Sequence, residues 1–177
     1  MYYTLIGSRE TPLEMIELGK QLALYLADKG YIVRSGGADG MDSCCDVVEG
    51  HQRNVYLPWS GFNGHKDGNG YSSKSRIKEK EATIIASRIH KNWNDCSKAA
   101  KTLHTRNVYQ ILSHTLDQPS DFVICWAIPL DMKGNVRGGT GTAVSLALKR
   151  NIPVFNLYHN SDIESIKACI DMLRGDK

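Results

Sequence analysis

Apolar and polar positions follow two different periods along the chain, which predicts strands and helices in alternation. Residues 2–6 have a strand-like pattern, whereas Leu18, Leu22 and Leu26 recur at the spacing of one helix face. Gly30 stands where a helix-ending glycine is expected, and a second strand follows at 31–33. Two strands joined by one helix form a βαβ unit, whose strands are parallel and whose crossover is right-handed.

The alternation continues to the end of the sequence. At the start of the first helix, Thr11 followed by Pro12 and Glu14 predicts a capping box. A short helical segment is expected up to Gly50. Further helices are predicted at 81–90, 97–116, 140–150 and 162–173, and further strands at 55–57, 122–127 and 153–157. The pattern predicts an α/β fold, a Rossmann-like doubly wound, mainly parallel sheet with helices on both faces.

Residues 58–80 interrupt this rhythm with Pro58 and four glycines. We therefore expect a single domain over residues 1–177 with an inserted loop at about 58–80. The loop carries aromatic residues between lysines and arginines, a composition that suits single-stranded nucleic acid (Trp59, Phe62, Tyr71). Acidic residues dilute its charge, so a lid or a subunit contact is the preferred interpretation.

Composition narrows the function classes. Lys and Arg total 22 and Asp and Glu 19, and the net charge of +3 is too small to indicate a nucleic-acid binder by itself. The five cysteines are an odd number without a Cys-x-x-Cys pair, which favours reduced thiols. A strand at the first residues leaves no room for a signal peptide, and no apolar run reaches the ~20 residues of a membrane span. A cytoplasmic protein without membrane contact is expected.

The 16 glycines fall partly into three loops at the carboxyl ends of predicted strands, at 7–9, 35–40 and 137–142. Glycine lets the backbone approach a ligand closely, and the helix that follows presents free N–H groups and a partial positive charge. This arrangement predicts a phosphate or nucleotide site, although it matches neither the P-loop nor the dinucleotide fingerprint. The candidate residues in the loops are Gly7, Ser8, Arg9, Ser35, Gly36, Gly37, Gly40, Asp42, Gly138, Gly139, Thr140, Gly141 and Thr142.

Four segments together resemble the Rossmann-like domain of the DNA-processing protein family DprA, also called Smf: 7–9 (Gly-Ser-Arg), 36–42 (Gly-Gly-Ala-Asp-Gly-Met-Asp), 104–107 (His-Thr-Arg-Asn) and 138–142 (Gly-Gly-Thr-Gly-Thr). More broadly they resemble the superfamily that unites this domain with LOG proteins and SLOG nucleotide sensors. The resemblance covers most of the chain outside 58–100. It implies a phosphate-bearing ligand at the glycine loops, Arg106 and Asn107 in the pocket, and a homodimer or larger assembly. DprA proteins usually carry further domains, whereas this sequence ends at Lys177, so we expect a stand-alone form of the domain.

Two residues depart from the related LOG enzymes, which resemble phosphoribohydrolases of nucleoside monophosphates. Arg137 replaces the proline of their glycine motif, and Ser145 replaces their catalytic glutamate. If hydrolysis occurs, Asp42 is the candidate catalytic acid; its alternative role is to complement a helix dipole. Trp126, at the end of the predicted central strand, either stacks on a base or belongs to the core.

The leading hypothesis is that the protein binds a nucleotide or a nucleotide-derived signalling molecule, for sensing or sequestration. The alternatives are a nucleoside monophosphate N-glycosidase with a variant catalytic residue, and single-stranded DNA binding of the DprA kind. The expected partners are a small nucleotide ligand, possibly single-stranded DNA, and further copies of the chain. No cofactor is expected. No metal site is expected either, because the six histidines show no zinc-type spacing with the cysteines.

Overall fold

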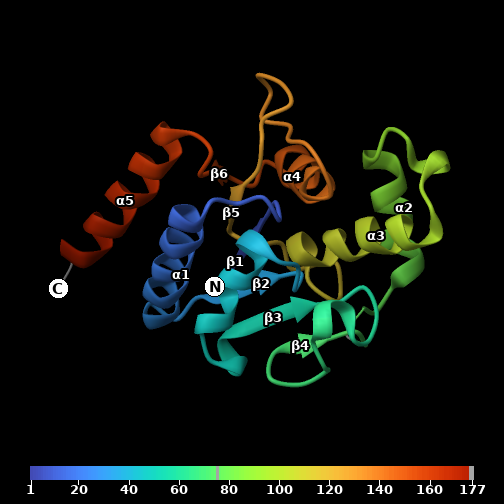
Figure 1. Ribbon diagram of the computed structural model, residues 1–177, viewed down its shortest axis with the longest axis horizontal. Helices are drawn as coiled ribbons and strands as arrows, with labels where there is room; N and C mark the ends of the chain where they lie inside the picture. Colours follow the sequence, from blue (N-terminus) through green and yellow to red (C-terminus); the bar gives the residue numbers. More distant parts are fainter. Residues whose placement is uncertain (75, 176–177) are drawn as a thin grey trace.

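The core of the protein is a six-stranded sheet in which all neighbouring strands pair in parallel (Figure 1). A computed structural model describes residues 1–74 and 76–175, with the side chains of the last helix described up to Ala168. The strands are β1 (Tyr2–Gly7), β2 (Ile32–Ser35), β3 (Arg53–Tyr56), β4 (Tyr71–Ser72), β5 (Phe122–Trp126) and β6 (Val154–Asn156). Their order β4-β3-β2-β1-β5-β6 places a topological switch point between β1 and β5. The predicted parallel α/β sheet is confirmed.

Helices cover both faces of this sheet, as a doubly wound fold requires (Figure 1). They are α1 (Leu13–Asp28), α2 (Glu79–Ile89), α3 (Lys98–Leu112), α4 (Thr140–Lys149) and α5 (Asn160–Gly175). Side chains of a strand alternate between the faces. Tyr3 and Leu5 of β1 accordingly pack with α1 and α5, whereas Ile6 packs in the separate core formed with α2, α3 and α4.

The prediction for the end of α1 is confirmed, whereas the prediction for its start is wrong. Gly30 ends the helix as predicted, because its φ of +78° is left-handed and the Tyr31 amide reaches back to the Leu26 carbonyl over 2.9 Å. The capping box at its start is wrong: Pro12 is the N-cap and no side chain caps the helix. The Thr11 hydroxyl instead donates to the Ser8 carbonyl over 2.6 Å, which fastens the first glycine loop.

The segment after β2 differs from the expected short helix. It is a 3₁₀ helix, η1 (Gly40–Val47), followed by the 3₁₀ turn η2 (Gly50–Gln52). The buried Met41, Cys44 and Cys45 side chains pack it against α1. The second glycine loop is therefore not followed by an α-helix.

The inserted loop at 58–80 is more structured than expected. It contains the turn η3 (Phe62–Gly64) and the short edge strand β4, which pairs in parallel with β3. Tyr71 of β4 is buried, and its hydroxyl donates to the Asp46 carboxylate. Ser75 lies outside the described residues.

The cysteines whose side chains are described are unpaired. Burial raises the pKa of the Cys44 and Cys125 thiols to about 12, which keeps them protonated and unreactive near neutral pH. Cys169 lies outside the described side chains. In the part of the chain that the structure describes, every helix is too short or too polar to cross a bilayer.

Candidate functional site

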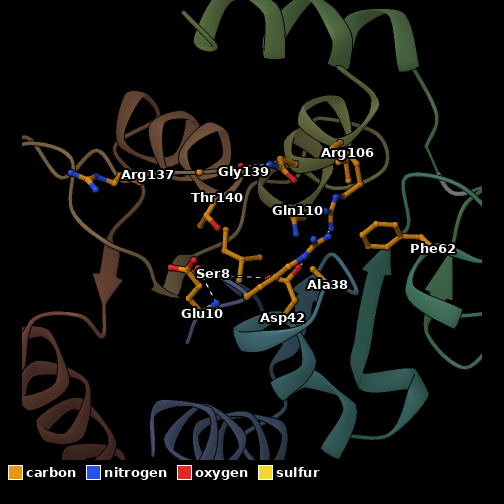
Figure 2. Close-up of a pocket in the computed structure, with 16 residues that line it drawn as sticks. Ser8, Glu10, Ala38, Asp42, Phe62, Arg106, Gln110, Arg137, Gly139 and Thr140 are labelled. Atoms are coloured by element: carbon orange, nitrogen blue, oxygen red, sulfur yellow. Dashed lines mark hydrogen bonds and ion pairs between the residues drawn. The ribbon is translucent and has the colours of Figure 1, made fainter. Parts of the chain in front are cut away.

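A cavity of about 370 Å³ opens at the carboxyl edge of the sheet, beside the ends of β1 and β5 (Figure 2). It lies at the switch point, where ligands bind in open α/β sheets. Residues from the three glycine-rich loops, from α3 and from the inserted loop meet around it. Its lining consists of Ile6, Gly7, Ser8, Arg9, Glu10, Ala38, Asp42, Phe62, Leu103, Arg106, Asn107, Gln110, Arg137, Gly138, Gly139 and Thr140.

The first loop is held against η1 and β5. The Gly7 amide donates to Asp42 Oδ1 over 2.9 Å, and the Ser8 amide donates to the Trp126 carbonyl over 2.9 Å. A Cβ on Gly7 would lie 2.5 Å from Met41 Cβ and 2.6 Å from the Trp126 carbonyl oxygen. Glycine is thus required for this close approach of the two loops.

The second loop makes room for Arg106. A Cβ on Gly36 would overlap Arg106 Nη1, so the guanidinium occupies the space that a side chain at 36 would fill. Gly40 has a φ of +77°, and its added Cβ would overlap the Ser8 carbonyl oxygen. Gly36 and Gly40 therefore allow Arg106 and the first loop to take their positions at the site, although neither glycine lines the cavity.

Arg106 is the most unusual group of the site. It extends from α3 between Phe62 and Gln110 towards Asp42 (Figure 2), and only 5% of it is exposed. Its Nη1 lies 3.7 Å from Asp42 Oδ2, too far for a hydrogen bond, and among the described residues neither Nη1 nor Nε has a hydrogen-bond partner. Burial lowers the pKa of Arg106, while the charge of Asp42 opposes that shift.

Asp42 lies at the base of the cavity and is 4% exposed. Burial raises the pKa of its carboxyl, whereas the Arg106 charge and the amides of Gly7, Ala38 and Gly36 act in the opposite direction. The carboxyl holds the first two loops together through these backbone bonds. These bonds are structural contacts at the start of η1; the catalytic and helix-dipole roles of Asp42 both stay predictions.

The third loop is fastened to α3 by an amide. Asn107 Nδ2 donates to the Gly139 carbonyl over 2.6 Å and so sets the start of α4 beside the cavity. Gly138 has a φ of +75°, and a Cβ added to Gly138 or Gly139 would meet nothing within 4 Å. The positive end of the α4 dipole thus faces open space.

Charge around the cavity is weakly positive. Three arginines and two acidic residues line it (Arg9, Arg106 and Arg137 against Glu10 and Asp42). Arg9 is exposed, and Arg137 is exposed and extends away from the cavity (Figure 2). Arg106 is consequently the one lining arginine that is enclosed.

Nine of the sequence-predicted site residues line the cavity: Gly7, Ser8, Arg9, Asp42, Arg106, Asn107, Gly138, Gly139 and Thr140. Others support it from outside. The Ser35 hydroxyl donates to the carbonyls of Leu5 and Asp42, and Gly36 and Gly40 permit the close approaches described above.

The other four predicted site residues do not line the cavity. Gly37 adopts a φ of +69° beside Leu57, and Gly141 lies against Val136, where an added Cβ would be 2.7 Å from the Val136 carbonyl oxygen. Trp126 is 9% exposed, belongs to the core and has its ring 5.7 Å from that of Tyr158. Thr142 bonds to His104 over 2.8 Å.

Seven residues that line the cavity were not among the predicted site residues: Ile6, Glu10, Ala38, Phe62, Leu103, Gln110 and Arg137. Phe62 lies under the guanidinium of Arg106, with its ring centroid 5.8 Å from Arg106 Cζ. Gln110 follows Arg106 by one helical turn, so the helix period from a known Arg106 would have found it. No comparable signal in the sequence links Phe62 to the cavity.

Two features bear on the N-glycosidase and the single-stranded DNA hypotheses. Ser145, at the position of the LOG glutamate, donates to Asn135 Oδ1 over 3.0 Å and does not line the cavity. In the inserted loop Phe62 and Tyr71 are buried, which leaves Trp59, 41% exposed, as the aromatic ring of this loop open to stacking.

No family model and no curated protein matches the chain. Among solved structures the chain is similar to DNA processing protein A from Helicobacter pylori, from a study of its single-stranded DNA binding mode. The two share 20% sequence identity with a TM-score of 0.55, and the match covers 99% of this chain and 81% of the other. This likeness shows a common Rossmann-like fold of the DprA type.

Proposed function

We propose that the cavity binds a nucleotide or a nucleotide-derived signalling molecule, with Arg106 holding its phosphate. The observation that carries the proposal is the buried guanidinium with two unpartnered donors. Leaving such donors unmet is costly, and a phosphate is the anion whose geometry suits a guanidinium fork best. The α4 N-terminus and the exposed Arg9 add positive potential at the mouth.

The size and lining of the cavity support a small ligand. Its volume of about 370 Å³ is within the range of small-molecule sites and short of the groove that a long strand requires. Phe62 and Leu103 add apolar surface beside the cations, as a base or ribose needs. Asn107 and Gln110 add amide groups that suit base edges.

The test is calorimetric titration with mono-, di-, cyclic and NAD-derived nucleotides, comparing wild type with two variants of Gly139. Gly139→Asp sets a carboxylate in the open space at the start of α4, where the φ of −60° accepts a side chain and a negative charge suits the helix N-terminus, so we expect the variant to fold. Gly139→Ala fits the same space without charge and is the matched control.

We expect micromolar or tighter binding of at least one nucleotide to wild type and to Gly139→Ala, and loss of that binding in Gly139→Asp. A wholly silent panel with wild type would refute the proposal. Equal affinity of both variants would show that the ligand lies elsewhere.

Single-stranded DNA is a second candidate, favoured by the fold shared with DNA processing protein A. Trp59 offers an exposed stacking surface, and Lys74, Lys78 and Lys80 are exposed on the same segment of the chain, 58–80. Fluorescence anisotropy with a labelled oligothymidylate should then give an affinity that falls steeply with salt. Alanine at those lysines should weaken it, and alanine at lysines of the α1 and α5 face should not (Lys20, Lys29 and Lys167). No retention at low salt would exclude this candidate.

The N-glycosidase alternative and the homodimer or larger assembly stay predictions. Asp42 and Glu10 are the carboxylates that line the cavity, so both would be replaced in a test of hydrolysis. Chromatography for free base after incubation with nucleoside monophosphates decides the first question. Light scattering decides the second.

A further inference from the structure

Three side chains of metal-ligand type meet at the turn between α2 and α3, outside the cavity. His90 is the C-cap of α2, Cys96 follows the turn η4 (Trp93–Asp95), and His104 lies in the second turn of α3. One ligand atom from each lies within 4.8 Å of the other two. Cys96 Sγ is 3.7 Å from His90 Nδ1, and the two imidazole centroids are 4.2 Å apart. We call these three residues the His–Cys–His cluster.

These separations are close to those of a metal-bound set. Zinc bonds thiolate sulfur at about 2.3 Å and imidazole nitrogen at about 2.0 Å, so tetrahedral ligands lie about 3.5 Å apart. Small side-chain rotations would close the widest gap. A thiolate with two imidazoles is also the donor set that zinc favours over harder cations such as magnesium.

A hydrogen bond from a neighbouring helix fixes the ring of His104 in an orientation suited to metal binding. Its Nδ1 is bonded to the Thr142 hydroxyl over 2.8 Å, which orients the ring and leaves Nε2 for the cluster. Among the described residues, no ion pair joins either imidazole to a carboxylate.

The His–Cys–His cluster lies where the end of α2 contacts α3. Ala82 and Ala86 of α2 are buried, and Ile85 and Ile89 pack partly buried against the same core. A bond network from His90 to His104 would pin the end of α2 to α3, the helix that also carries Arg106. Metal binding of this kind adds directly to folding stability.

We propose that the His–Cys–His cluster binds a zinc-class divalent cation, with these three residues as protein ligands and a water molecule in the fourth position. Cys96 loses its thiol proton to solvent on binding, and the thiolate offsets one of the two metal charges. The site is independent of the nucleotide proposal, because none of its ligands lines the cavity. Its sequence signature, His-x5-Cys-x7-His, matches no zinc-finger spacing, so sequence reading alone does not detect it.

The experiment uses the full chain freed of metal by a chelator and titrated with Co²⁺, then Zn²⁺. Tetrahedral cobalt gives intense ligand-field bands, and a thiolate ligand adds a charge-transfer band. We expect both in wild type at one equivalent, their loss on adding Zn²⁺, and protection of Cys96 from alkylation, read by mass spectrometry. His51→Gln, at an exposed histidine of η2, should behave as wild type.

Cys96→Ser should lose the charge-transfer band and bind at least tenfold more weakly; His90→Gln should weaken binding similarly and keep that band. Both positions are only partly buried, so the variants are expected to fold, and circular dichroism without metal checks this. Absence of tetrahedral bands in wild type, or an unchanged spectrum in Cys96→Ser, would overturn the proposal.

Discussion

Replacing Gly36 with alanine tests the role of Arg106 without changing any charged residue. The added Cβ would overlap Arg106 Nη1 and crowd Gln110 Nε2. The φ of Gly36 is outside the left-handed region, so its backbone accepts alanine. The guanidinium is the far end of a flexible side chain and must move, while the strand and loop remain in place.

The size of the effect follows from the contacts that are lost. A hydrogen bond to a charged group contributes about 1.5 kcal/mol or more, so two donors from Arg106 to a phosphate amount to about 3 kcal/mol. At about 1.4 kcal/mol per factor of ten, Gly36→Ala should raise the Kd for the nucleotide about a hundredfold. The free energy of unfolding should fall by only about 1–2 kcal/mol, because Asp42 keeps its bond to the Gly7 amide.

Calorimetry with the tightest nucleotide of the panel measures the first quantity, and urea unfolding measures the second. Arg106→Lys should lose most of the same affinity, since an ammonium group cannot replace a bidentate fork. Gly139→Ala, in open space, should keep wild-type affinity. Wild-type affinity in folded Gly36→Ala would refute the assignment of Arg106 as the phosphate ligand.

Three further substitutions test the frame of the site. Arg34 is fully buried in β2 and donates to the Gln118 carbonyl over 2.7 Å. Arg34→Met removes this donor and should lower the free energy of unfolding by about 1–3 kcal/mol in urea titrations. A neutral result would mean that the arginine only fills space. Gly40→Ala combines a left-handed φ with overlap on the Ser8 carbonyl, so it should lower the free energy of unfolding by about 2 kcal/mol or more and abolish nucleotide binding. Wild-type stability of this variant would contradict the geometry. Burial raises the folded-state pKa of Asp42 above its usual value near 3.8, so its protonation stabilises the fold at low pH, and that contribution is lost as pH rises through the folded pKa. Asp42→Asn should remove this part of the pH dependence in unfolding measured from about pH 4 upward, and parallel pH profiles of the two proteins would disprove the raised pKa.

Local patterns were sufficient wherever neighbouring residues decide the conformation. The apolar run at 122–127 predicted β5, an interior strand between β1 and β6, and Gly30 predicted the end of α1. Strand burial and a left-handed helix stop are both read from adjacent positions. The capping box failed because the Thr11 hydroxyl found a better acceptor in the Ser8 carbonyl, a bond made possible by the fold of the loop.

Long-range contacts account for what the sequence did not reveal. Phe62 reaches the cavity because the inserted loop packs over the second glycine loop, 44 positions before Arg106 in the chain. Edge strand β4 forms because β3 offers free backbone groups, which Tyr71–Ser72 satisfy despite a weak strand pattern. His90, Cys96 and His104 are brought together by the pairing of α2 with α3.

The sequence by itself determined the parallel α/β architecture and the three glycine-rich loops at one sheet edge, because hydrophobic period and glycine position are local properties. Asp42 was a candidate from its place after the second glycine loop, whereas Arg106 and Asn107 became candidates through the resemblance to DprA. Only the tertiary structure decided that Arg106 lies over Gly36 with two donors unmet, and that Trp126 turns into the core. Burial and hydrogen-bond satisfaction depend on every element packed around a group, and the chemistry of this site follows from them.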